Sequence, residues 1–192
     1  DEARCGTVSS DYEHFLAWKT VYPKKLEVYK KKNSIHRSQE ILVQGMLDKE
    51  NFLKIIKNFT VFKPVSDSSE IKIVCRYQQF RAVGKIINKL LKGKSPYDRS
   101  GVIWHTQGSG KSLTMVFLVK QLRDTEKIKD YKVIMVNDRV DLEDQLGETA
   151  KLTDETVNYV ENRNQLDKLK TQSSNLALVM MHKFGKKKIS YK

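Results

Sequence analysis

The sequence predicts an α/β fold that is built on a phosphate-binding loop and a mostly parallel sheet. The apolar, β-rich run 102–104 precedes a glycine-rich turn, and an apolar helical pattern follows from residue 113 to residue 122. The same order of strand, turn and helix returns in KDYKVIMVNDRVDLEDQL, where residues 132–136 are expected to form a buried strand. A further apolar strand is predicted at LALVMM, residues 176–181. Strands that alternate with helices in this way favour a parallel sheet.

The chain before the loop is predicted to form a separate part. We expect an N-terminal arm and a helical extension over residues 1–70, followed by the loop-bearing lobe over residues 71–192. Helical periodicity between residues 39 and 59 predicts two short helices, with Asp48 capping the second. FTVFKPV and IKIVC are expected to be extended, and a helix that Gly93 ends is expected after Arg76. The arm anchors are predicted to be Phe15, Leu16, Trp18, Val21 and Tyr22, and the apolar helix face Leu42, Met46, Phe52, Leu53, Ile56 and Phe59.

The loop TQGSGKS at residues 106–112 has the composition of a site that binds the phosphates of a nucleotide. Gly108 and Gly110 have no Cβ, so the backbone can curl and direct consecutive N–H groups at one anion beside the helix N-terminus. Lys111 would reach the β and γ phosphates, and the Ser112 hydroxyl would coordinate Mg²⁺. The usual first glycine is His105 here, and the plain alternative is an ordinary turn between strand and helix. The candidate phosphate-binding residues are Thr106, Gln107, Gly108, Ser109, Gly110, Lys111 and Ser112.

A glutamine upstream of the loop is the candidate reader of the base. The amide of Gln79 could pair with both N6–H and N7 of adenine. Arg76, Gln79 and Ala82 fit the spacing R-x-x-Q-x-x-A, which favours Gln79 over Gln78 and places Arg76 in the same candidate site. The alternative is that Gln79 is simply an exposed residue at a helix start.

Polar residues after the second predicted strand are candidates for DNA contact. Open α/β sheets bind ligands at the carboxyl ends of their strands, which is where Arg139 and Gln145 are expected. Asp138 and Asp141 are expected to cap the next helix, and a purely structural cluster of caps and ion pairs remains the alternative.

Composition favours a polyanionic partner in a reducing compartment. The 36 Lys and Arg residues exceed the 23 Asp and Glu residues and give a net charge of +13, which favours nucleic acid, although a lysine-rich surface alone could explain the excess. Cys5 and Cys75 stand apart from each other and from any zinc-ligand spacing, so we expect reduced thiols and a cytoplasmic protein. The chain contains no apolar run of membrane-spanning length and is expected to have no membrane partner.

WHTQGSGKSLTM and DRVDLEDQL together resemble the helicase region of the R subunit (HsdR type) of type I restriction-modification enzymes. EHFLAWKTVY, EILVQGML and YQQFRAV resemble the stretches before the loop in that family, so the resemblance runs from about residue 6 to residue 184. It implies a partial RecA-like lobe of the superfamily 2 helicase type, with ATP and Mg²⁺ as cofactors. It also implies duplex DNA and the modification and specificity subunits as partners, a bacterial or archaeal source, and a parent protein that is an ATP-dependent site-specific deoxyribonuclease.

Two other functions stay open on the sequence. A different P-loop enzyme, such as a small-molecule kinase, would leave DRVDLEDQL unexplained. A non-catalytic nucleotide- or DNA-binding module is favoured by the lack of a recognisable Asp-Glu pair beyond Met181. For the same reason we expect the chain alone to bind ATP and DNA without hydrolysis or cleavage.

Overall fold

The structure is a computed structural model, and it describes residues 2–25, 38–66, 69–138, 141–169, 171 and 175–181. Arg139 and the segment after Met181 lie outside the described residues. The chain packs into two compact units, Asp1–Lys129 and Asp130–Lys192, which are described separately. The boundary predicted at residue 70 stays a prediction.

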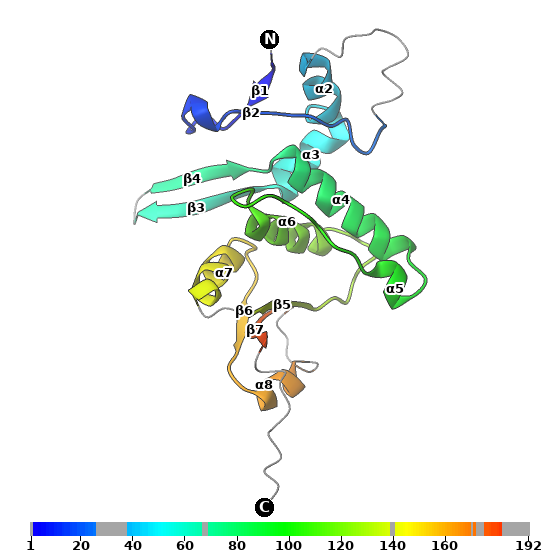
Figure 1. Cartoon of the computed structure of the whole chain (residues 1–192), viewed down its shortest axis with the longest axis vertical. Coiled ribbons are helices and arrows are strands. Elements are labelled where there is room, and N and C mark those ends of the chain that lie inside the picture. The colour runs from blue at the N-terminus through cyan, green and yellow to red at the C-terminus, as the bar shows by residue number, and fades with distance from the viewer. Residues whose placement is uncertain are drawn as a thin grey trace, which may run out of the picture. The chain divides into compact units, whose positions relative to one another are not determined.

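The first unit contains the arm, a hairpin and the helices around the loop (Figure 1). Short strands β1 (Arg4–Cys5) and β2 (Leu16–Ala17) pair antiparallel, and strands β3 (Thr60–Ser66) and β4 (Ser69–Val74) form the second antiparallel hairpin. The helical elements are the 3₁₀ turn η1 (Tyr12–His14), α2 (Ser38–Gly45), α3 (Lys49–Asn58), α4 (Tyr77–Lys92), α5 (Pro96–Arg99) and α6 (Lys111–Arg123).

The arm is held by Trp18 and Val21, each 2% exposed. The Trp18 Nε1–H donates a hydrogen bond of 2.8 Å to the Thr20 carbonyl oxygen, and this turn lies against Gly45 of α2. A Cβ on Gly45 would come within 2.0 Å of the same oxygen, so the contact requires glycine. Leu16 is exposed, which corrects its predicted role as an anchor: the alternation of a two-residue strand leaves it on the open face.

An aromatic cluster joins the arm to the helices near the loop. The Phe80 ring lies 5.8 Å from the ring of Trp18 and 4.9 Å from that of Phe59, measured between centroids. Phe59 in turn lies 5.6 Å from Phe117 of α6. Buried aromatic pairs at these separations stabilise the packing beyond the area they bury, so the arm, α4 and α6 share one core.

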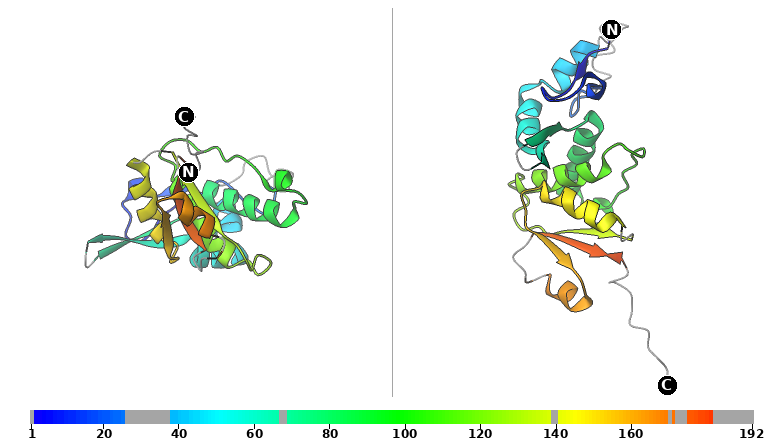
Figure 2. Two further views of the ribbon diagram at one scale, coloured as in Figure 1. Left: turned by 90° about the horizontal axis from the view of Figure 1, so that it is seen from below. Right: turned by 90° about the vertical axis from the view of Figure 1, so that its left-hand side faces the viewer.

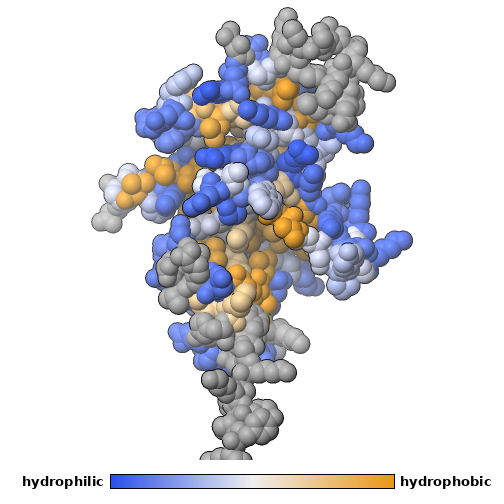
Figure 3. All heavy atoms as spheres, in the orientation of Figure 1, coloured by the Kyte–Doolittle hydropathy of each residue, from blue (hydrophilic) through white to orange (hydrophobic). Residues whose placement is uncertain are grey.

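The two helices predicted over residues 39–59 are present as α2 and α3, and Asp48 caps α3 by accepting hydrogen bonds from the N–H groups of Glu50 and Asn51. The predicted apolar face of α3 is wrong. Asn51, Ile55 and Asn58 face inward, because both asparagine side chains find hydrogen-bond partners inside the unit. Phe52, Leu53 and Ile56 are exposed, as are Phe62 and Val65 of the hairpin, which projects with orange atoms on the left of Figure 3.

The buried strand predicted at residues 102–104 is wrong. These residues form no strand and pair with none of the described strands, and Val102 and Trp104 are 94% and 88% exposed. A β-rich run needs neighbouring strands to complete its backbone hydrogen bonds. Here the segment instead runs beside α4, where it helps to line a hollow described below.

The second unit holds the predicted parallel sheet. Strands β5 (Val133–Asn137), β6 (Val157–Val160) and β7 (Leu176–Met180) pair in parallel in the order β5-β7-β6. Helix α7 (Asp141–Lys151) connects β5 to β6, and α8 (Arg163–Lys168) connects β6 to β7. Since these crossovers run in opposite directions along the sheet, right-handed connections place α7 and α8 on opposite faces, as Figure 2 shows.

Strand β7 is the centre of the second unit, and all five of its residues are buried. The expectation of a buried strand at 132–136 holds only in part. Met135 is 5% exposed, whereas Ile134 and Val136 are about half exposed, because β5 is an edge strand and only its alternate side chains face the packed side. None of the described helices has the length and apolar character that a bilayer-spanning helix needs.

Candidate nucleotide-binding site

The candidate phosphate loop is closed by its own backbone and by Ser109. The Ser109 hydroxyl donates a hydrogen bond of 2.6 Å to the Thr106 carbonyl oxygen, and the Ser109 N–H donates to the same oxygen at 3.3 Å. Ser109 is 5% exposed, so this turn is held inside the unit while Thr106 and Gln107 face solvent. The loop is therefore a formed turn with an open outer rim.

Both glycines of the loop have the left-handed backbone conformation that favours glycine. The φ angles are +71° at Gly108 and +77° at Gly110. Gly110 is the N-cap of α6, and it has no side chain with which to bond the first helical N–H groups. Because the first N–H groups of a helix have no partner inside it, the start of α6 offers donors and a positive dipole end to an anion. This arrangement fits a phosphate group.

Lys111 lies at the mouth of the loop, and its contact with phosphate stays a prediction. Its Nζ donates hydrogen bonds to the carbonyl oxygens of Thr106, at 3.1 Å, and His105, at 3.4 Å. The residue is exposed, so its ammonium group can exchange these weak contacts for a phosphate oxygen without crossing a packed core. Ser112 follows in the first turn of α6 and is partly buried.

Gln79 is the one sequence-predicted residue of α4 that reaches the loop. Its Nε2–H₂ group donates to the carbonyl oxygens of Gly110, at 2.9 Å, and Ser109, at 3.4 Å. Its Oε1 accepts a hydrogen bond of 2.7 Å from the Arg76 N–H, and the side chain is 2% exposed. The Arg76 side chain is exposed at the start of α4. Adenine recognition by Gln79 stays a prediction, and in this structure the amide holds the loop.

Thr114 takes part in the same cluster and was not singled out from the sequence. Its N–H and Oγ1 bond the Gly110 carbonyl oxygen at 3.1 and 3.2 Å, so that one oxygen accepts from Gln79 and twice from Thr114. A threonine four residues after the last loop glycine is the available signal, because its hydroxyl can reach the carbonyl one turn back.

The candidate DNA contacts belong to the second unit. Arg139 lies outside the described residues, and Gln145 is exposed on α7, where its backbone carbonyl accepts a hydrogen bond from Thr149. The structure therefore leaves the DNA role of both residues a prediction.

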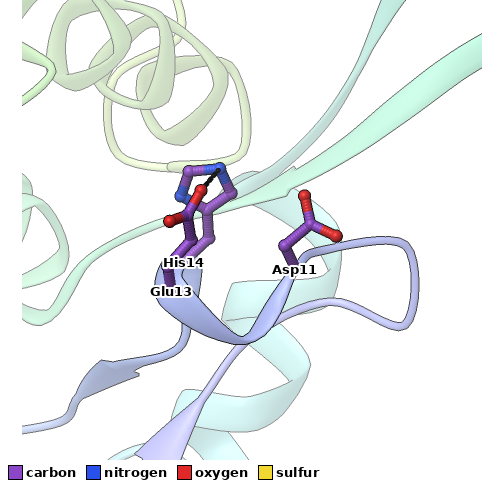
Figure 4. Close-up of side chains that lie close together, drawn as sticks. All are labelled: Asp11, Glu13 and His14. Atoms are coloured by element: carbon purple, nitrogen blue, oxygen red, sulfur yellow. Dashed lines mark ion pairs between the residues drawn. The ribbon is translucent and has the colours of Figure 1, made fainter.

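A third group of polar side chains lies on the arm. Asp11, Glu13 and His14 bring one possible ligand atom each within 4.8 Å of one another, and Figure 4 shows the ion pair of 3.9 Å between His14 and Glu13. All three residues are exposed. Exposed acidic groups of this kind are common without a ligand, and no function is assigned to them.

Comparison with known proteins places residues 78–192 in a match to the SWI2/SNF2 ATPase family. The chain is 33% identical over 179 residues to the type I restriction enzyme HindI endonuclease subunit of Haemophilus influenzae. This alignment covers 89% of this chain and 16% of that protein. It is 28% identical over 203 residues to a putative type I restriction enzyme endonuclease subunit of Methanocaldococcus jannaschii, with coverage of 97% and 19%. These relatives confirm the resemblance drawn from the sequence, and the chain spans less than a fifth of their length.

Proposed function

Since this chain belongs to the SWI2/SNF2 ATPase family, we propose that it is the nucleotide-binding part of the ATP-driven, DNA-translocating motor of a type I restriction enzyme endonuclease subunit. The two relatives named above are both called type I restriction enzyme endonuclease subunits, and their alignments cover 89% and 97% of this chain. The activity, the cytoplasmic location and the partner subunits of the full-length protein are part of this proposal.

One observation carries the nucleotide part of the proposal. The two loop glycines, in left-handed conformation, lie at the N-terminus of α6, and the buried Gln79 amide holds the second glycine in place. Thr106, Gln107, Gly108 and Ser109 form the turn, whose backbone would surround the phosphates. Lys111 would contact the β and γ phosphates, and the Ser112 hydroxyl would bind the Mg²⁺ that accompanies ATP. When bound, the ion would offset phosphate charge.

The DNA part of the proposal is supported by charge. With a net charge of +13, the chain would attract duplex DNA through its excess of lysine and arginine, and Arg139 and Gln145 are the proposed contacts of the second unit. We propose modification and specificity subunits as the protein partners, as the family resemblance of the sequence implies. Hydrolysis and DNA cleavage are proposed for the parent protein, and the chain alone is expected to bind without turnover.

Titration of a fluorescent ATP analogue in the presence of Mg²⁺ tests the proposal. We expect saturable binding that Lys111→Ala weakens and that unlabelled ATP reverses. The matched control is Lys54→Ala on α3, which removes another exposed lysine that is remote in sequence from the loop. Equal affinity of a folded Lys111→Ala variant and the unaltered chain would contradict the proposed site. Phosphorylation of a small acceptor would instead favour the kinase alternative.

A further inference from the structure

A hollow of about 670 Å³ lies between α4 and the extended segment 101–105. All of its lining residues belong to the first unit, and it adjoins the residue before the phosphate loop. Its described lining includes four cationic side chains, Arg81, Lys85, Lys89 and Arg99, and no carboxylate. The hollow is therefore an electropositive site next to, and distinct from, the loop itself.

Three of these cations form a stripe on one helix. Arg81, Lys85 and Lys89 are spaced four residues apart on α4, so they lie one above another on the same side. Like charges at this spacing destabilise a helix. An anion with several regularly spaced negative charges would relieve this repulsion along the whole stripe. Arg99 adds the fourth positive charge. Its Nε–H donates a hydrogen bond of 3.0 Å to the Gly93 carbonyl oxygen, which orients the guanidinium group.

The wall opposite α4 is apolar and unusually exposed. Trp104 is 88% exposed, in contrast to Trp18 at 2%, and Val102 and Ile103 beside it are 94% and 46% exposed. The described residues therefore leave most of the Trp104 side chain uncovered. An exposed indole beside a row of cations has the two features that bind a nucleic acid strand: an aromatic face for a base and positive charges for the backbone.

Two polar atoms in residues lining the hollow are buried without a hydrogen-bond partner among the described residues. They are Oε1 of Gln78 and Nδ1 of His105. A buried acceptor without a partner costs stability. Both atoms are covered by neighbouring protein atoms, so they are not counted among the contacts of a ligand in the hollow.

We propose that this hollow binds single-stranded DNA, with a base stacked on Trp104 and phosphates on Arg81, Lys85, Lys89 and Arg99. The inference rests on the proposed function, because a motor that moves along DNA must contact its strands. The single strand is favoured over the duplex because bases stacked inside a duplex cannot offer a free face to an indole. The hollow and the phosphate loop are separate sites, because Lys111 is not among the residues that line the hollow.

Fluorescence anisotropy of a dye-labelled oligothymidylate of about 16 nucleotides, the upper end of one such site, measures the binding. We expect Trp104→Ala to weaken it by about 5- to 150-fold, the range for loss of one base stack, and Trp104→Phe to recover most of the loss. Tryptophan fluorescence gives a second readout, since only Trp104 is exposed enough to be quenched by a stacked base.

The charge contacts have their own signature. Lys85→Gln with Lys89→Gln should lower the slope of log affinity against log salt by roughly 1.4, about 0.7 for each phosphate contact to a single strand. The control pair Lys49→Gln with Lys54→Gln removes the same charge from exposed positions of α3 and should leave that slope near the unaltered value.

Three results would overturn the inference. If the chain binds DNA and ATP but the Trp104 and lysine variants bind the oligonucleotide as the unaltered chain does, the site is wrong while the proposed function stands. If duplex competes as well as the single strand, the choice of ligand is wrong. If neither form of DNA binds at low salt, the DNA part of the proposed function fails as well.

Discussion

The side-chain nitrogen of Gln79 donates a hydrogen bond of 2.9 Å to the carbonyl oxygen of Gly110. The Oε1 of the same amide accepts a hydrogen bond of 2.7 Å from the Arg76 N–H. One buried side chain therefore joins the first turn of α4 to the N-cap of α6, and the shape of the phosphate loop depends on a residue 31 positions away in the sequence.

Gln79→Ala is expected to lower the free energy of unfolding by about 1–3 kcal/mol, because the Arg76 N–H loses its acceptor and the Gly110 carbonyl keeps only its two bonds from Thr114. Urea unfolding measures the change. Gln78→Ala on the neighbouring residue is the matched control: the Gln78 Oε1 has no hydrogen-bond partner among the described residues, so its removal should be near neutral. A larger loss in Gln78→Ala than in Gln79→Ala would contradict this assignment.

The same residue gives a prediction about the base. If Gln79 reads adenine with two hydrogen bonds, Gln79→Ala should lose roughly 1–3 kcal/mol of preference for ATP over GTP. Because its amide is bonded to Gly110 and Arg76 in this structure, reading the base would require it to leave those partners. Competition of ATP and GTP for the loop measures the preference. An unaltered chain with no base preference would remove the hypothesis.

Local signals were sufficient for the two positive-φ glycines and for the Asp48 cap, because glycine permits that conformation by itself and the cap bonds only neighbouring N–H groups. Periodicity also located α4 and two of the three parallel strands, β5 and β7. It did not show that Asn51 and Asn58 face inward, since their burial depends on partners distant in sequence.

The segment 102–104 also shows that local sequence does not determine burial. Its apolar composition predicted burial, but burial of a strand requires neighbours that local sequence does not specify. The Gln79 contact with Gly110 was equally inaccessible, because the spacing R-x-x-Q-x-x-A says nothing about which groups the amide meets.

The two loop glycines should respond differently to alanine. Both have positive φ, so either substitution carries a backbone cost of roughly 1–2 kcal/mol. A Cβ on Gly110 would also lie 2.7 Å from the Gln79 Nε2, whereas nothing lies within 4 Å of a Cβ on Gly108. We expect Gly110→Ala to be the less stable variant in urea unfolding and the weaker binder of the ATP analogue. Equal stability of the two would show that the Gln79 contact yields without cost.

Lys111 and Ser112 should also differ. Lys111→Ala removes the only full positive charge of the loop, whereas Ser112→Ala removes one hydroxyl ligand of an ion that retains other ligands. Lys111→Ala is therefore expected to weaken Mg-ATP binding more than Ser112→Ala does. Titration with and without Mg²⁺ separates them, because only the Ser112→Ala defect should depend on the metal.

Acid should weaken the contact between α3 and the C-terminal end of α6. Burial raises the pKa of the Asp124 carboxyl, but hydrogen bonds from Lys57 and Asn58 outweigh it and hold that pKa below its usual value. The bond from Asn58 is 2.8 Å long, and Asn58 is 3% exposed. A lowered folded-state pKa means that this stabilisation is fully present above the unfolded pKa, about 3.9, and is lost as pH falls through the folded value.

Asp124→Asn should consequently be less stable than the unaltered chain at pH 6, and the difference should shrink below about pH 4, where the unaltered carboxyl also becomes neutral. Urea unfolding between these pH values measures it. Glu126→Gln, which neutralises an exposed carboxylate two residues away, is the matched control and should not reproduce the pH-dependent difference. A gap between Asp124→Asn and the unaltered chain that stays constant through this range would mean that the Asp124 charge contributes nothing to the contact and that only the shape of its side chain matters.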